Sequence, residues 1–153
     1  PLREPCKHTS NAYSGNRLTD AIGGGVCQGS STLYNCVLLA DLEVVTRSCH
    51  GATVAYLPLG LDAAVNWGTT DFQFRNNFHF PVKIEAETTV DLVKMRILGT
   101  DEKDYYIEMT SGYDDSREDV IYAVSYKNKY SKETGELISK DREAFSTYYR
   151  NVG

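Results

Sequence analysis

The chain reads Gly23-Gly24-Gly25-Val26-Cys27-Gln28-Gly29-Ser30-Ser31-Thr32 where a glycine-rich turn leads directly into the pattern of a helix. Glycine tolerates positive φ and lets the backbone approach a ligand closely, and the three hydroxyl side chains offer capping oxygens. The pattern predicts a helix over residues 27–40 with Cys27 in its first turn. Free amide N–H groups and the helix dipole favour a thiolate there. Cys27 is therefore the candidate nucleophile, and a buried, inert thiol is the alternative.

Outside this helix the sequence is typical of strands separated by glycine and asparagine turns. Thr134-Gly135 predicts a hairpin turn near the C-terminal end. Residues 1–22 show no sustained periodicity and are expected to be a mostly irregular segment that wraps the site, with at best one short element near residues 17–22. The expected strands are 42–46, 52–56, 71–75, 82–86, 92–98, 105–109, 120–126 and 136–146.

These elements predict an α+β fold, in which one principal helix carries the cysteine at its N-terminus and packs on a mainly antiparallel sheet. Residues 1–100 are expected to form the catalytic core. Residues 101–153 are expected to form a β-rich extension that packs on the core and does not fold independently.

Length and charge limit the possible functions. A chain of 153 residues suffices for one domain, and its net charge of −5 gives no basic surface for nucleic acid or anionic lipid. No apolar run approaches the roughly 20 residues of a membrane span. Because the sequence begins at Pro1, we expect a domain of a longer polypeptide, with any membrane anchor outside these residues. We also expect this domain to be a monomer.

A nucleophilic cysteine needs a general base, and His50 is the best candidate because it lies in a loop-like segment between two expected strands. Asp62 is the candidate acceptor that orients His50, and an Asx turn or helix cap is the alternative role. His8 and His79 are weaker candidates, and His79 is interpreted as structural or surface-exposed.

The glycine turn and the start of the helix are expected to bind the substrate and its developing oxyanion. Arg75 is a candidate anchor for a substrate carboxylate, with a solvated strand arginine as the alternative. Ser31 has a simple capping role as its alternative. The proposed binding residues are Gly24, Gly25, Gln28, Ser31 and Arg75.

The other cysteines do not form a metal motif. Cys36 is interpreted as a small core side chain, whereas Cys6 and Cys49 either pair in an oxidising environment or remain free. A metal site drawn from these two and the neighbouring histidines, His8 and His50, has no recognised zinc spacing. We therefore expect no metal and no cofactor.

The stretch that begins at Gly23 and continues to Asn35 resembles the signature of the VanW domain family. The resemblance continues through the His50 loop, through Tyr56-Leu57-Pro58-Leu59-Gly60-Leu61-Asp62-Ala63 and through Asp71-Phe72-Gln73-Phe74-Arg75-Asn76-Asn77, and covers roughly residues 20–100. Two departures are visible. Gly29 stands where a larger apolar residue is usual, and His50 lies between Cys49 and Gly51 where His-Ser is common.

The resemblance implies a bacterial, extracytoplasmic protein of the cell envelope, from a family first associated with glycopeptide resistance. Some members are understood as cysteine L,D-transpeptidases that cross-link peptidoglycan stem peptides. It thus implies that Cys27 forms a thioester with one stem and transfers the acyl group of that stem to the amine of a second stem. Transfer to water instead would make the protein an L,D-carboxypeptidase. The alternative is a non-catalytic module that binds stem peptides or related envelope ligands.

Overall fold

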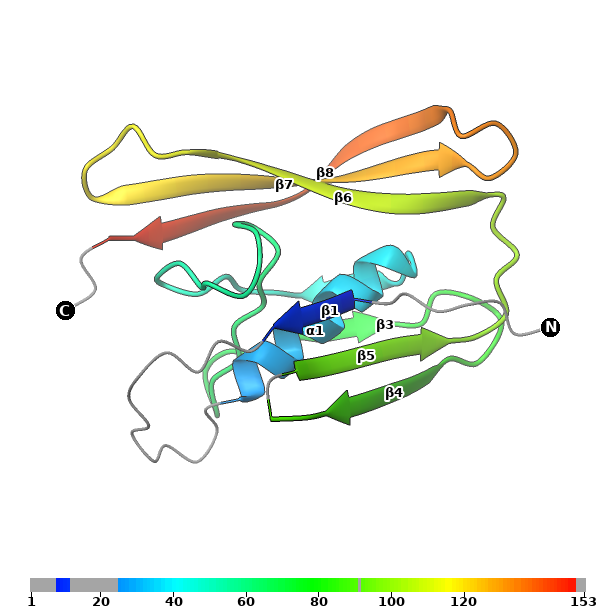
Figure 1. Cartoon of the computed structure of the whole chain (residues 1–153), viewed down its shortest axis with the longest axis horizontal. Coiled ribbons are helices and arrows are strands. Elements are labelled where there is room, and N and C mark those ends of the chain that lie inside the picture. The colour runs from blue at the N-terminus through cyan, green and yellow to red at the C-terminus, as the bar shows by residue number, and fades with distance from the viewer. Residues whose placement is uncertain (1–7, 12–24, 91, 151–153) are drawn as a thin grey trace.

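The computed structural model describes residues 8–11, 25–90 and 92–150, which form one helix and eight strands (Figure 1). The elements are β1 (His8–Asn11), α1 (Val26–Leu39), β2 (Glu43–Thr46), β3 (Gln73–Arg75), β4 (Lys83–Thr88), β5 (Leu92–Leu98), β6 (Tyr105–Asp114), β7 (Val120–Ser131) and β8 (Leu137–Tyr149).

Every strand pair in the described part of the chain is antiparallel, and the strands form three sheets ordered β1-β5-β4, β2-β3 and β6-β7-β8. In Figure 1 the long β6-β7-β8 sheet covers one side of the molecule, and α1 lies between it and the β1-β5-β4 sheet. The expected α+β class with antiparallel pairing is confirmed, and the strands divide into three separate sheets. The short strands β2 and β3 pair only with each other, so their hydrogen bonds do not continue into either larger sheet.

Tertiary contacts rather than intrinsic propensity hold α1 together. Its sequence includes Gly29, Ser30, Ser31 and Thr32, which are weak helix formers. Its second half supplies Tyr34, Cys36, Val37 and Leu38, all of them buried. Burial of this apolar set against two sheets compensates for the weak propensity of the first half.

Two clusters of buried core residues involve α1. One joins Tyr34 and Leu38 to Leu61 and Ala63, with Met109 of β6 packed against it. The other joins the remaining apolar residues of the helix to the β1-β5-β4 sheet, and its buried members are Cys36, Val37, Leu42 and Ile97. The placement of Cys36 agrees with its interpretation as a core side chain.

An unusual residue follows the C-cap of the helix, which is Ala40. Asp41 has φ of 58°, a conformation that glycine usually supplies after a helix. Its backbone N–H donates to the Leu38 carbonyl, and the Leu42 N–H donates to the Val37 carbonyl. The Asp41 carboxylate then accepts hydrogen bonds from Tyr105 Oη at 2.6 Å and Lys127 Nζ at 3.0 Å, and so joins α1 to the β6-β7-β8 sheet.

Two sequence expectations differ from the structure. Residues 8–11, expected to be irregular, form β1 against β5, whereas the short element expected near residues 17–22 lies outside the described residues. Residues 52–56, expected to form a strand, consist of bends and coil. No described strand lies alongside them to complete a ladder, and β-branched content alone does not make a strand without a partner.

Candidate active site

Cys27 is the second residue of α1, and its partly exposed side chain lines an open cavity of about 930 Å³. The Cys27 Sγ donates to the carbonyl oxygen of Val65 at 3.3 Å. The cavity is lined by Val26, Cys27, Val65, Asn66, Trp67, Gly68, Thr69, Thr70 and Asp71. A thiol in this position is accessible to a ligand that enters the cavity.

The N-terminus of α1 carries no side-chain cap from the described residues. Gly25 is the N-cap residue, and the first intrahelical bond runs from the Gly29 N–H to the Gly25 carbonyl at 3.0 Å. The amides of Val26, Cys27 and Gln28 therefore have no acceptor within the helix. Uncapped amides beside a thiol form a setting that suits an anion.

The predicted binding residues of the glycine turn are only partly described. Gly24 lies outside the described residues, and Gly25 has open space where a Cβ would stand. The side-chain nitrogen of Gln28 is buried without a hydrogen-bond partner, and Gln28 is not among the residues that line the cavity.

The serines of α1 do not cap it, because the helix begins before them. Ser31 is fully buried, and its Oγ accepts from the Ala63 N–H at 3.0 Å. Ser30 Oγ donates to the Ala63 carbonyl at 2.6 Å, and Asn35 Nδ2 donates to the Leu61 carbonyl at 2.7 Å. These bonds fix the segment 61–65 along the helix, and Thr32, also expected as a cap, instead bonds back to the Gln28 carbonyl at 2.8 Å.

His50 and Asp62 form a close pair at the start of the same segment. Asp62 Oδ2 lies 2.6 Å from His50 Nδ1 and also accepts from the His50 backbone N–H at 2.8 Å. Because an ionised carboxylate can only accept, Nδ1 carries the proton of the neutral ring and Nε2 is left as a free base. The two bonds to one carboxylate oxygen fix both the tautomer and the orientation of the imidazole.

Two residues that sequence reasoning missed hold Asp62 in place. Arg47 Nη2 donates to Asp62 Oδ1 at 3.1 Å and its Nε donates to the Asp62 carbonyl at 2.7 Å. Tyr148 donates to Asp62 Oδ1 at 2.5 Å from β8 and accepts from the Gly60 N–H at 2.7 Å. Arg47 also donates to Ser146 Oγ at 2.8 Å and lies over the Tyr34 ring.

These contacts keep the Asp62 carboxylate ionised. Burial would raise the pKa of Asp62, but the hydrogen bonds from Tyr148 and His50 and the charge of Arg47 outweigh it and hold that pKa below its usual value. Burial and the neighbouring Asp62 charge raise the pKa of Tyr148 to about 12, so its hydroxyl is a donor at neutral pH.

Tyr56 is a third residue that the sequence did not identify. Its side chain lies near Ser31 and within electrostatic range of Cys27 and Asp62. Burial raises the pKa of Tyr56, and the nearby Cys27 and Asp62 raise it further. The Tyr56 phenol is therefore protonated at neutral pH.

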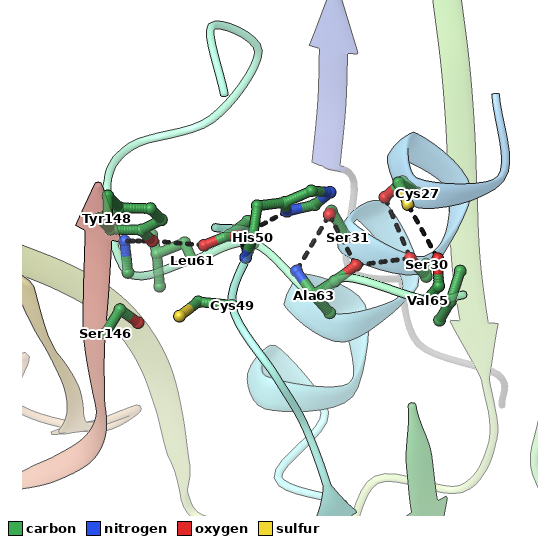
Figure 2. Close-up of polar contacts among 12 residues, drawn as sticks. Cys27, Ser30, Ser31, Cys49, His50, Leu61, Ala63, Val65, Ser146 and Tyr148 are labelled. Atoms are coloured by element: carbon green, nitrogen blue, oxygen red, sulfur yellow. Dashed lines mark hydrogen bonds and ion pairs between the residues drawn. The ribbon is translucent and has the colours of Figure 1, made fainter. Parts of the chain in front are cut away.

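The segment 61–65 links the thiol to the imidazole. The Cys27 thiol is hydrogen-bonded to the Val65 carbonyl, and the His50 ring is hydrogen-bonded to Asp62. Asp62 lies three residues before Val65. Three residues span at most about 11 Å between Cα atoms, so both side chains are anchored to one short stretch of backbone. In Figure 2 the His50 imidazole extends from its loop toward the helix, on the side where Cys27 lies.

The remaining predicted residues lie elsewhere. Arg75 is exposed on β3, where its Nη1 pairs with Glu43 Oε2 at 3.1 Å, and it is not among the residues that line the cavity. His79 is exposed in the 76–82 segment. Cys49 is a free thiol that donates to the Thr147 carbonyl at 3.6 Å, and Cys6 lies outside the described residues.

The described residues offer neither a cluster of metal ligands nor a helix of membrane-spanning length. No group of three or more potential metal ligands occurs in ranges 8–11, 25–90 and 92–150. Within the same ranges, no helix is long and apolar enough to cross a membrane.

Comparison with known proteins agrees with the resemblance in the sequence. The family model described as "VanW like protein" matches residues 8–98. The uncharacterized protein YoaR of Bacillus subtilis (strain 168) is 47% identical over 70 residues, which are 46% of this chain and 23% of YoaR. The matched part is thus about a quarter of that relative's length. No solved structure matches the chain.

Proposed function

The chain belongs to the family of VanW-like proteins, and from this premise we propose that it is a peptidoglycan L,D-transpeptidase with Cys27 as its nucleophile. The observation that carries the proposal is the common anchoring of Cys27 and His50 on the segment 61–65, at the side of an open cavity. A nucleophile, a base and an acceptor that orients the base are the parts required for acyl transfer through a covalent intermediate.

In the first half-reaction, His50 Nε2 takes the Cys27 proton, and the sulfur attacks the carbonyl carbon before the terminal D-residue of a tetrapeptide stem. The C–N bond breaks, the D-amino acid leaves with the proton from His50, and a thioester remains on Cys27. Asp62 stabilises the imidazolium that exists between these two steps.

In the second half-reaction, the side-chain amine of a neighbouring stem attacks the thioester. His50 takes a proton from this amine and returns it to the sulfur, so the thiol is regenerated and an amide bond joins the two stems. Attack by water in place of the amine would make the same site an L,D-carboxypeptidase. The balance between them depends on which nucleophile the cavity admits.

The negative oxygen of each tetrahedral intermediate needs donors. The uncapped amides of Cys27 and Gln28 are the donors we propose, because they lie at the positive end of α1 and have no helical acceptor. The protonated hydroxyl of Tyr56 is a further candidate donor. Ser30 and Ser31 form hydrogen bonds with Ala63, so we assign them the role of positioning the segment 61–65 and not of contacting the substrate.

Intact-protein mass spectrometry tests the nucleophile. The domain is mixed with a disaccharide tetrapeptide, and wild type is compared with Cys27→Ala and with Cys49→Ala as a matched control for a second partly exposed thiol. We expect an acyl adduct with wild type and Cys49→Ala and none with Cys27→Ala. An adduct that persists in Cys27→Ala would refute the assignment, and binding of the peptide without any adduct would favour the non-catalytic binding module.

A second assay tests the reaction type. The products formed after incubation with two stem peptides are separated, and their masses are measured by mass spectrometry. Dimers in which one amide bond joins the carbonyl of the third residue of one stem to the side-chain amine of the third residue of the other would support transfer. Formation of shortened monomers alone would identify the protein as a carboxypeptidase.

A further inference from the structure

Trp67 is exposed to solvent and lines the cavity that also contains Cys27. It is the only tryptophan of the chain, and its side chain is 99% exposed. An indole of this size is mostly buried in folded proteins, and full exposure of one gains nothing for folding. The exposed ring is therefore better explained by contact with a ligand than by a role in folding.

The backbone around Trp67 is a closed turn. The Asn66 N–H donates to the Thr70 carbonyl at 2.8 Å, and the Thr70 N–H donates to the Asn66 carbonyl at 3.0 Å. Gly68 has φ of +75°, which the turn needs and which most side chains would strain. The indole is thus presented by a fixed backbone, which lowers the entropic cost of contact with a ligand.

Apart from Val26 and Val65, the side chains that line the cavity with Trp67 and Cys27 are polar, and one of them is acidic. Asn66, Thr69, Thr70 and Asp71 line the same cavity, and among the residues that the structure describes no lysine or arginine does. A phosphate or a nucleic acid would need cations, and the net charge of −5 disfavours both. A sugar ring fits better, because it has an apolar C–H face for the indole and hydroxyl groups for amide, hydroxyl and carboxylate side chains.

We propose that Trp67 is the platform of a saccharide subsite that binds the amino sugar at the root of the stem peptide. This inference rests on the proposed function, since the sugar is the part of that substrate attached to the first stem residue. The third residue carries the reacting carbonyl, and three extended residues span about 10 Å, which is on the order of the breadth of a cavity of about 930 Å³. A stem held at Cys27 can therefore bring its sugar to Trp67.

The lone tryptophan makes the test direct, because all indole emission reports on this site. The Cys27→Ala protein, which cannot turn over, is titrated with the disaccharide tetrapeptide, with the free tetrapeptide and with a chitin oligosaccharide. We expect a saturable blue shift of the emission with the two sugar-bearing ligands and none with the free tetrapeptide. A shift of equal size with the free tetrapeptide, or no shift with either sugar, would overturn the subsite.

Calorimetry on two variants separates the contribution of the ring to sugar binding from that of the turn that carries it. Trp67→Ala should lower the ratio of affinities, disaccharide tetrapeptide over free tetrapeptide, by about tenfold, and Trp67→Phe should restore most of it because a flat ring remains. An unchanged ratio in Trp67→Ala would contradict the proposal.

The outcome is separable from that of the proposed function. An emission shift in a protein whose wild type forms no acyl adduct would keep the saccharide subsite and refute the transpeptidase. An acyl adduct without any shift would keep the transpeptidase and refute the subsite.

Discussion

Tyr148 donates a 2.5 Å hydrogen bond to Asp62, which lies 86 residues earlier in the chain. Tyr148 belongs to β8, beyond the residues 8–98 that the family model matches. The carboxylate that orients His50 is thus supported by a strand outside the matched domain. This contact, together with the bond from Arg47 to Ser146 of β8, joins the C-terminal strands to the candidate site.

Loss of the Tyr148 hydroxyl should weaken both the fold and the site. Tyr148→Phe removes a buried bond to a charged acceptor and leaves the Gly60 N–H unpaired, so we expect the free energy of unfolding to fall by about 2–3 kcal/mol. Urea denaturation measures this change, and the rate of the acyl adduct should fall with it. The neighbouring Tyr149 is 58% exposed, so Tyr149→Phe should change stability by less than about 0.5 kcal/mol. Equal stabilities for the two variants would contradict the role given to Tyr148.

Replacement of His50 should slow acylation without unfolding the protein. His50→Gln removes the base, and general-base catalysis typically contributes about 10²- to 10⁴-fold, so we expect the adduct to form at least about 10²-fold more slowly. The measurement is the time course of the adduct by intact mass. His79→Gln is the matched control, because His79 is exposed and lies away from Cys27 in the chain. Equal rates in His50→Gln and wild type would remove His50 from the mechanism.

The parts of the fold that follow local patterns were predictable from the sequence. The alternation in residues 92–98 gave β5 with its observed bounds, and the helix was displaced by one residue at each end. Thr134-Gly135 lies between β7 and β8, where Gly135 has φ of +72°. These features depend on neighbouring residues, which the sequence displays directly.

The partners of the site were less predictable, because they depend on tertiary contacts. The sequence offered His50 and Asp62 as candidates, and the structure pairs them. Nothing local distinguishes Tyr148 from the other tyrosines, of which the chain has 11 in all. The two-residue period of β8 places Ser146 and Tyr148 on one face, both buried, but does not say which residues that face meets.

Gly29 offers a test of how α1 is held. Glycine inside a helix is destabilising relative to alanine, and a Cβ at Gly29 would meet Met95 Cε at 3.7 Å, an ordinary contact. We expect Gly29→Ala to raise the free energy of unfolding by about 0.5–1 kcal/mol. Gly135→Ala is the opposite case, since its positive φ should make the variant less stable by about 1–2 kcal/mol. Denaturant unfolding of both variants measures these two changes in the free energy of unfolding. A destabilised Gly29→Ala would show that the helix cannot accept the added methyl group.

The carboxylate of Asp41 should make the stability of the protein depend on acid pH. Burial would raise the pKa of Asp41, but hydrogen bonds from Tyr105, Lys127 and Lys129 outweigh it and lower the pKa to about 2. A lowered folded-state pKa stabilises the protein above the unfolded-state pKa, 3.8 here, and this contribution is lost as the pH falls toward the folded value of about 2.

Asp41→Asn is the variant that isolates this charge, because asparagine also tolerates the positive φ of the position. We expect wild type to be more stable than Asp41→Asn by about 2 kcal/mol above pH ~4, and the difference to close between pH ~4 and ~2. Urea unfolding across this range measures it. Asp104→Asn, at an exposed carboxylate beside β6, serves as the control, and we expect it to differ from wild type by less than about 0.5 kcal/mol throughout. A difference for Asp41→Asn that stays constant down to pH ~2 would mean that the stabilisation comes from the shape of the turn and not from the ion pairs with Lys127 and Lys129.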